Sequence, residues 1–175
     1  MRLFIAFEVS EEAKQHFLDL QKQMPNSAAV MTFPKDFHQT LKFLGEVPDD
    51  KFEFVKDLFS KIKFAPFEAN IEGIGVFPNE SRINVVWVGI GPKNKIVELQ
   101  QNVEKLFSDA FGKEERFLPH VTICRVKAVR DKTLLDDAIK KLKPEQIKFA
   151  VSSIKLIKST LLKEGPVYET VAELS

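Results

Sequence analysis

Two short stretches of this 175-residue chain share one pattern: His38-Gln39-Thr40-Leu41 and His120-Val121-Thr122-Ile123. Each places a threonine two residues after a histidine, and together they use two of only three histidines in the chain. Residues i and i+2 of a β-strand project from the same face, so each His-Thr pair should share a face while its neighbours anchor the strand in a core. The pattern predicts two equivalent strands that each present an imidazole and a hydroxyl.

The patterns around the two motifs repeat at an offset of 82 residues, the distance between the motif histidines. Adding 82 to Ile5 gives Trp87 in a matching apolar strand, and adding it to Asp49 gives Asp131 at a matching helix start, without any gap. Side-chain identity across this offset is weak, so the repeat lies in the pattern of elements. Chance similarity between two ordinary α+β stretches is the alternative explanation.

Hydrophobic periodicity and turn residues divide each half into strands and helices. Their interleaving predicts an α+β fold in one domain of residues 1–175, with two similar lobes at about 1–82 and 83–175 between which strands can exchange. The expected strands lie at residues 3–7, 30–33, 38–44, 67–77, 83–90, 119–126, 148–161 and 168–174, and the expected helices begin at Ser10, Pro48, Asn94 and Asp131.

The composition excludes several classes of protein. The longest apolar runs, such as residues 85–90, are far shorter than the roughly 18 to 20 residues that a membrane-spanning helix needs. The N-terminal segment meets Glu8 too early for a signal peptide, so we expect a cytoplasmic protein without membrane association. A single cysteine, Cys124, excludes an intramolecular disulfide and a zinc site with two thiolates, and three histidines leave little for a metal site. We therefore expect no metal and no cofactor.

The formal charge of +1 hides a difference between the halves. Residues 1–82 carry 10 basic and 13 acidic side chains, whereas residues 83–175 carry 16 and 12. This balance predicts no strong non-specific affinity for nucleic acid and suits recognition of a terminal phosphate better than that of a long backbone. An ordinary solvated surface would show the same modest imbalance.

A pair of imidazoles suits phosphoryl transfer without a metal ion. Their ordinary pKa lies near 6.5, so one histidine can be neutral and remove a proton while the other is charged and donates one. In-line displacement at phosphorus places the incoming and departing oxygens on opposite sides, which two equivalent strands could serve from two sides. A threonine hydroxyl beside each imidazole can donate to a phosphate oxygen. Two structural histidines and two strand-forming threonines are the alternative.

Five segments spread over nearly the whole chain carry a resemblance to a known family. They are R-x-F-I-A-F at Arg2–Phe7, H-Q-T-L-K-F-L-G-E at His38–Glu46, G-I-G-V-F-P at Gly73–Pro78, P-H-V-T-I-C-R-V-K at Pro119–Lys127 and K-S-T-L-x-x-x-G-P-V-Y-E at Lys158–Glu169. On these segments the sequence resembles the RNA 2′,3′-cyclic phosphodiesterases of the two-histidine phosphoesterase superfamily, also described as RNA 2′-5′ ligases. It departs from the family at Gln39, where an aliphatic residue is usual, and at Cys124, where Gly or Ala is frequent.

The resemblance implies a bilobal α+β fold around a pseudo-two-fold axis, with a cleft between two antiparallel sheets. It places the proton donor at His38 and the proton acceptor at His120, and it assigns phosphate binding to Thr40 and Thr122. The implied reaction opens a 2′,3′-cyclic phosphate at an RNA end or on a small oligonucleotide to a 2′-phosphomonoester. A cellular role in 2′-5′ ligation and a non-catalytic RNA or nucleotide-binding module are the alternatives, and we expect a monomer.

Arg125 is a further candidate for binding the substrate phosphate, because its guanidinium is always charged and matches phosphate geometry. Strict alternation would turn it away from the cleft with Val121 and Ile123, so this role requires a bulge or a strand end. Lys42 shares the His38 face by the same alternation, and we expect it to be solvated.

The remaining candidates are better explained as parts of the fold. Cys124 is expected to be a small core or cleft-edge residue, because a cysteine nucleophile would leave two equivalent His-Thr pairs unexplained. We expect His16 to lie at the boundary of a helix stripe. Phe7 and Tyr168 could stack on a base, but 16 of the aromatic residues are Phe, which favours a core role for most of them.

Overall fold

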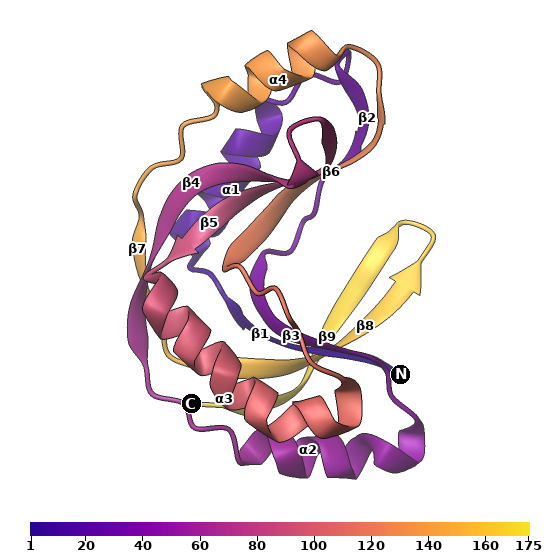
Figure 1. The fold of residues 1–175 in the computed structure, drawn as a ribbon, viewed down its shortest axis with the longest axis vertical. Coiled ribbons are helices and arrows are strands. Elements are labelled where there is room, and N and C mark those ends of the chain that lie inside the picture. Colours follow the sequence, from indigo (N-terminus) through magenta and orange to yellow (C-terminus); the bar gives the residue numbers. More distant parts are fainter.

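Strand β3 (His38–Glu46) begins at the first motif histidine and forms one edge of a four-stranded sheet. The order of this sheet, which we call sheet A, is β3-β1-β8-β9, with β1 at Arg2–Glu8, β8 at Ile154–Leu162 and β9 at Gly165–Leu174. The computed structural model describes all residues from 1 to 175 (Figure 1). All neighbouring strands in sheet A are antiparallel.

Strand β6 (His120–Val129) begins at the second motif histidine and lies inside a five-stranded sheet, which we call sheet B. Its order is β2-β6-β5-β4-β7, and all neighbouring pairs are again antiparallel. The predicted α+β fold with two antiparallel sheets is therefore confirmed. The other strands of sheet B are β2 at Ala29–Thr32, β4 at Phe67–Asn79, β5 at Arg82–Gly91 and β7 at Lys148–Val151.

Two helices begin at the side-chain caps expected from the sequence. The Ser10 hydroxyl accepts a hydrogen bond from the Ala13 amide at 3.2 Å, and the Asp131 carboxylate accepts one from the Leu134 amide at 2.9 Å. Such caps satisfy amides that have no partner within the helix. The helices are α1 at Glu11–Lys22, α2 at Phe52–Ser60 after a 3₁₀ turn at Asp49–Lys51, α3 at Lys93–Phe111 and α4 at Lys132–Lys141.

The two halves of the repeat are interlocked in space. Sheet A takes β8 and β9 from the C-terminal half, and sheet B takes β2 and β4 from the N-terminal half. Helix α1 packs against β6 and helix α3 packs against β3, so each motif strand is covered by a helix of the other half (Figure 1). Gln21 on α1 reinforces this arrangement by donating to the Ile123 carbonyl at 3.0 Å and to the Pro34 carbonyl at 2.7 Å. Neither half contains all the strands of either sheet.

The register of the repeat differs from the expectation in its first strand. Thr40 lies opposite Ala6, and Thr122 lies opposite Trp87, so the equivalent positions in β1 and β5 are offset by 81 residues, from Ala6 to Trp87. The prediction that Ile5 matches Trp87 without a gap is therefore wrong by one residue. Between the motif strands the offset of 82 holds, because both begin at their histidines.

A β-bulge interrupts each motif strand directly after the motif threonine, and β3 carries a second one at Leu44. In β3, Thr40 pairs with Ala6 and Lys42 pairs with Ile5, which leaves Leu41 as the extra residue of a β-bulge. A bulge lets two consecutive side chains point to one face, so the alternation reverses beyond it. Leu41 and Lys42 are accordingly both buried, although the sequence pattern expected them on opposite faces.

The bulge in β6 has the same effect. Thr122 pairs with Trp87 and Cys124 with Val86, so Ile123 is the extra residue there. Cys124 is consequently fully buried beside Ile123. Phe43, which strict alternation would place on the core face with Gln39 and Leu41, is instead 59% exposed because it follows the bulge of its own strand.

Lys42 is buried in an ion pair that joins the first motif strand to the other half of the chain. Its ammonium donates to a Glu104 carboxylate oxygen on α3 at 2.7 Å and to the Gly112 carbonyl at 2.7 Å. Glu104 also accepts from the Gln100 side chain at 3.2 Å and from the Glu114 amide at 3.4 Å. The expectation of a solvated lysine is therefore wrong, because the bulge turns Lys42 toward α3, where it is only 4% exposed.

A single apolar cluster of 38 buried residues includes side chains from both sheets and from the helices. Phe7 belongs to this cluster and packs edge to face on Phe67 at 5.9 Å between ring centroids, so it is a core residue that no base can reach. A smaller cluster of Phe4, Ala6 and Ile157 lies on the other face of sheet A. None of the four helices is both long and apolar enough to cross a membrane.

We expect Lys42→Met to lower the free energy of unfolding by about 3–5 kcal/mol, because it leaves the Glu104 carboxylate buried without its counter-charge. Urea unfolding at pH 7 measures this effect. Lys61→Met is the matched control, because Lys61 pairs with Asp57 where both side chains are more than half exposed, and such pairs are worth about 0–1 kcal/mol. Lys42→Met combined with Glu104→Met should be less destabilised than Lys42→Met alone. Equal losses in the free energy of unfolding for Lys42→Met and Lys61→Met would contradict a buried ion pair at Lys42.

Candidate active site

The four motif side chains lie on one face of each sheet, which we call the site faces. In β3, Gln39 is fully buried on the core side while His38 and Thr40 are half-buried on the other side. His120 and Thr122 have the same arrangement in β6. Strands β3 and β6 are in contact, so the structure brings the two motif strands together from separate sheets (Figure 1).

The His38 imidazole is packed between aromatic rings. Its ring centroid lies 4.9 Å from that of Phe4 and 5.1 Å from that of Tyr168, the latter edge to face. This burial lowers the pKa of His38 to about 4, and the nearby carboxylates of Asp36 and Glu8 oppose the shift only in part. His38 is therefore neutral at pH 7 in the free protein.

The His120 imidazole is fixed by a hydrogen bond to the backbone. Its Nδ1 lies 2.7 Å from the Leu118 carbonyl oxygen, which can only accept. Nδ1 therefore carries the proton of the neutral ring, and Nε2 keeps a free lone pair. Burial lowers the pKa of His120; the Leu118 hydrogen bond raises it, and the Arg125 charge lowers it further. The neutral ring is in the tautomer that a general base requires.

An aromatic wall supports His120 as one supports His38. The Phe77 ring meets His120 edge to face at 4.9 Å, and the Trp87 ring lies 5.9 Å away. Trp87 lies across Gly75 so closely that a Cβ at this position would overlap the indole ring. Gly75 is thus required for Trp87 to lie against β4 beside the histidine.

Arg125 lies on the site face, as its proposed role requires. It is exposed on β6, because the bulge at Ile123 reverses the alternation between Thr122 and Arg125. Its charge acts on His120 of its own strand and also on Tyr168 of sheet A. The guanidinium therefore lies within electrostatic reach of both sheets.

A small pocket of about 130 Å³ lies beside His38. Its site-face walls include Tyr168, Ile157 and Thr170 from β8 and β9, and its rim carries Lys14 and Lys35 along with Glu8 and Asp36. A larger cavity of about 630 Å³ lies between α4 and the β4–β5 hairpin, where no motif residue lines it. Of these two pockets, the small one includes a motif residue, His38, in its lining.

Other candidates from the sequence lie away from this chemistry. Cys124 is fully buried on the core side, and burial raises the pKa of its thiol to about 12, so it is not a thiolate. His16 on α1 lies outside both motifs and accepts a hydrogen bond from the Glu145 amide at 2.9 Å. No three His, Cys, Asp or Glu side chains are grouped so that they could hold a metal ion.

Sequence reasoning missed the aromatic side chains around the histidines. Phe4 alternates with the core residues Leu3 and Ile5, so strict alternation in β1 already places it on the other face. The alternation of β1 thus indicates the face of Phe4 from the sequence alone. Phe77 and Trp87 could not be assigned to His120 in this way, because their contacts depend on how β4 and β5 pair.

Comparisons with known proteins agree with this geometry. Residues 35–161 match the family model described as the 2′-5′ RNA ligase superfamily. The chain is 37% identical to the RNA 2′,3′-cyclic phosphodiesterase of Methanocaldococcus jannaschii, over 99% of each chain, and 32% identical to that of Archaeoglobus fulgidus, over 97% of each. The crystal structure of TT0787 from Thermus thermophilus superposes with a TM-score of 0.80 at 25% identity, covering 99% of this chain and 96% of that chain.

We expect the imidazole of His38 to titrate near pH 4 in the free protein, and that of His120 below the ordinary value of 6.5. A histidine whose pKa is lower in the folded state binds fewer protons than in the unfolded chain, so the free energy of unfolding should fall as the pH drops from about 6.5 toward 4. Long-range ¹H–¹⁵N NMR spectra measure both pKa values and should show His120 protonated at Nδ1. Replacing His38 with Gln should reduce the acid-dependent loss of stability. Titration of His38 at or above 6.5 would contradict the buried environment.

Proposed function

The chain belongs to the 2′-5′ RNA ligase superfamily, and we propose that it opens RNA 2′,3′-cyclic phosphates to 2′-phosphomonoesters by histidine acid-base catalysis without a metal ion. Near full-length similarity to curated RNA 2′,3′-cyclic phosphodiesterases supports the reaction class. The observation that carries the mechanism is the presentation of an imidazole and a hydroxyl on the site face of each motif strand. One strand lies in each sheet, so a phosphate between them meets one pair from each side.

In this proposal His120 is the general base. Its neutral ring holds the proton on Nδ1 against the Leu118 carbonyl, so Nε2 can accept a proton from water. The water oxygen attacks phosphorus and forms the new P–O bond while its proton moves to Nε2. The Arg125 charge then disfavours keeping a second proton on the ring, which helps His120 return to the neutral state.

His38 is the general acid in the same step. The P–O3′ bond breaks, and the departing O3′ takes a proton from the His38 imidazolium, which leaves a 3′-hydroxyl and a 2′-phosphomonoester. The free protein keeps His38 neutral because its burial lowers the pKa to about 4. A bound phosphate anion beside the ring favours the charged form, so the pKa of His38 should rise when the substrate binds. Binding of the substrate phosphate thus promotes protonation of His38, the general acid.

Thr40, Thr122 and Arg125 are the proposed phosphate-binding groups. Each threonine shares the site face of its strand with a histidine, and each hydroxyl can donate one hydrogen bond to a phosphate oxygen. Arg125 follows the second motif on the same face and supplies a fixed positive charge. Donors preorganised in this way stabilise the charge that develops at phosphorus in the transition state.

The substrate class, the compartment, the oligomeric state and the number of domains are proposed from the sequence. The proposed substrate is the terminal cyclic phosphate of RNA or of a small oligonucleotide, and the proposed enzyme is a cytoplasmic monomer that folds as one domain. A catalyst accelerates both directions of a reaction, so the same groups could join RNA ends through a 2′-5′ bond. A binding module that has lost turnover would keep the same site faces. Assaying turnover of a cyclic phosphate distinguishes the hydrolase from the binding module.

We expect the protein to open adenosine 2′,3′-cyclic phosphate in the presence of EDTA and to release only the 2′-phosphomonoester. Replacing His38 or His120 with Ala should each lower kcat by about 10² to 10⁴, the usual contribution of one general acid or base. Liquid chromatography with authentic 2′- and 3′-phosphate standards measures both rate and product. The pH-rate profile should be bell-shaped and should report the coupled pair of imidazoles.

His16→Ala is the matched control: this third histidine lies outside both motifs and accepts from the Glu145 amide, so its loss should leave kcat unchanged. Tight binding of the cyclic phosphate without turnover over hours would favour the binding module. Loss of activity in EDTA that Mg²⁺ or Mn²⁺ restores would overturn the metal-independent mechanism, as would full activity in both His38→Ala and His120→Ala.

Arg125→Gln should raise KM by about tenfold or more, in line with the loss of one charge-assisted hydrogen bond of roughly 1.5–3 kcal/mol. Arg125→Lys should recover part of this loss, because it keeps the charge but not the planar fork. Steady-state kinetics on the same cyclic phosphate measure the effect. Arg130→Gln serves as the control, since Arg130 is exposed beyond the end of β6. Unchanged KM in Arg125→Gln would contradict a phosphate contact.

A further inference from the structure

Arg2 is a positively charged residue on the site face that the proposed mechanism does not use. We propose that Arg2 binds the phosphodiester that precedes the terminal nucleotide, so that the site prefers the ends of oligonucleotides to mononucleotide cyclic phosphates. This inference rests on the proposed function, because it assumes that the terminal cyclic phosphate lies at the motif residues. It names a second phosphate-binding position at the other end of β1.

The alternation of β1 places Arg2 on the site face. Leu3, Ile5 and Phe7 belong to the main core, whereas Phe4 and Ala6 belong to the small cluster on the opposite face. The register shifts between β1 and β3 leave the extra residues in β3, so β1 itself alternates regularly. Arg2 therefore projects with Phe4 and Ala6, and it is exposed.

A row of polar side chains crosses sheet A at the position of Arg2. Arg2 pairs with Ser159 on β8, and Ser159 pairs with Tyr168 on β9. The Tyr168 ring extends from this row to Phe4 at 5.6 Å and to His38 at 5.1 Å. The row thus continues the aromatic wall of His38, and it offers a guanidinium and two hydroxyls as donors to a phosphate.

The charged groups around Tyr168 agree with the placement of Arg2 on the site face. Burial raises the pKa of Tyr168, while Arg125 from sheet B and Arg2 from sheet A both lower it and Asp36 raises it further. Both arginines therefore lie within electrostatic reach of one hydroxyl. Arg125 is assigned to the cyclic phosphate, which leaves Arg2 as the second arginine that acts on this hydroxyl.

The acidic side chains nearest to Arg2 in the sheet are engaged elsewhere. Glu46, which lies opposite Arg2 on β3, has a carboxylate oxygen 3.8 Å from the Met1 amino group. Glu8, at the other end of the same face of β1, pairs with Lys155 at 3.0 Å. Arg2 itself forms no ion pair within 4.0 Å in the structure, so its charge is free for a ligand.

The spacing fits one nucleotide. Thr40 lies opposite Ala6, and Arg2 lies four residues further along β1, which corresponds to about 13 Å at the usual strand rise of roughly 3.3 Å per residue. An extended arginine side chain together with one sugar-phosphate unit spans a gap of this size. The terminal nucleoside would then lie over Tyr168, which is only partly buried, with its 5′-linked phosphodiester at Arg2.

The test compares two substrates in one assay. The first is adenosine 2′,3′-cyclic phosphate, which has no phosphodiester on its 5′ side, and the second is the dinucleotide ApA with the same terminal cyclic phosphate and a 2′-O-methyl group on its first sugar. We expect the wild-type kcat/KM to be about tenfold higher for the dinucleotide, the factor that corresponds to ~1.4 kcal/mol. Arg2→Gln should lose this advantage and keep the mononucleotide rate, whereas Arg2→Lys should keep part of the advantage.

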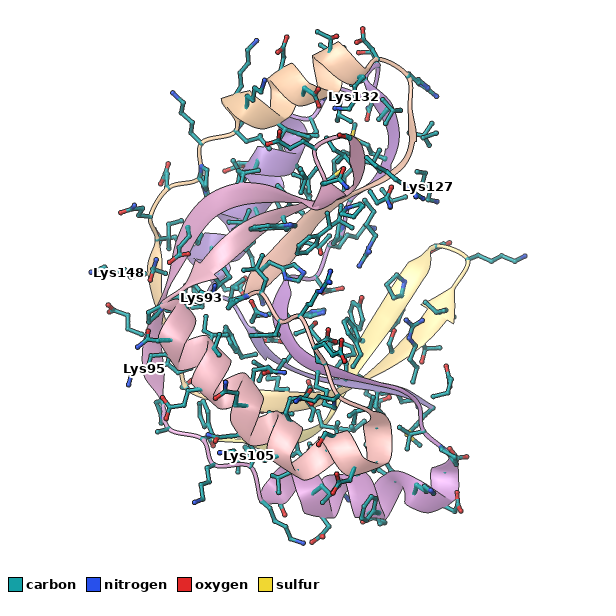
Figure 2. The ribbon with its side chains drawn as sticks, in the orientation of Figure 1. Lys93, Lys95, Lys105, Lys127, Lys132 and Lys148 are labelled. Atoms are coloured by element: carbon teal, nitrogen blue, oxygen red, sulfur yellow. The ribbon has the colours of Figure 1, made fainter.

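Two controls identify the contact. A dinucleotide with an uncharged methylphosphonate linkage should lower the wild-type rate to that of Arg2→Gln and should not lower the Arg2→Gln rate further. Lys105→Gln removes one positive charge from the exposed side of α3 (Figure 2) and should preserve the preference. Failure of the wild-type protein to open either substrate would overturn the proposed function itself.

Other outcomes would overturn the inference alone. These are equal wild-type rates on both substrates, an equal loss of both rates in Arg2→Gln, or a preference that survives the methylphosphonate linkage. The last result would show that the second nucleotide is recognised through its base or sugar. An equal loss of both rates would show that Arg2 supports the fold of the site face.

Discussion

One extra residue directly after the threonine of each motif strand determines which side chains reach the site faces. The bulges at Leu41 and Ile123 let His-x-Thr face outward, place two consecutive residues in the core and then return the next side chain to the site face. Without this reversal Arg125 would point into the core beside Ile123, where an unpaired guanidinium would be costly. The same reversal in β3 buries Lys42 and exposes Phe43, so equivalent positions of the two strands serve different purposes.

Burial of a bulge leaves polar groups that need partners, and the interlocked halves supply them. The Ile123 carbonyl accepts from Gln21 on α1, which belongs to the first half. In the first motif strand Lys42 donates to Glu104 on α3 and to the Gly112 carbonyl, both in the second half. The Glu104 carboxylate also accepts from the Glu114 amide, near the start of the segment that leads to Leu118 and His120. The packing of each motif strand therefore depends on the other half of the chain.

The two imidazoles are alike in sequence and different in environment. His38 is enclosed by Phe4 and Tyr168 near two carboxylates, whereas His120 is held by a backbone carbonyl and lies near Arg125. Burial lowers the pKa of both rings, but the neighbouring charges act in opposite directions: the carboxylates favour the charged form of His38, and the guanidinium disfavours that of His120. The proposed division into donor and acceptor agrees with the signs of these neighbouring charges.

The sequence by itself determined most of the elements, the two motif strands and the side chains that carry the proposed chemistry, but the strand expected at 148–161 is divided between β7 and β8 in different sheets. Strand and helix positions follow from local periodicity and caps, as at Ser10 and Asp131, and the repeated His-x-Thr pattern is visible without a structure. Only the tertiary structure decided which strands share a sheet, the one-residue gap between Ala6 and Trp87, the burial of Lys42 and the direction of Arg125. These features depend on pairing between segments far apart in the chain, and a bulge leaves no mark in the alternation that could separate it from a regular strand.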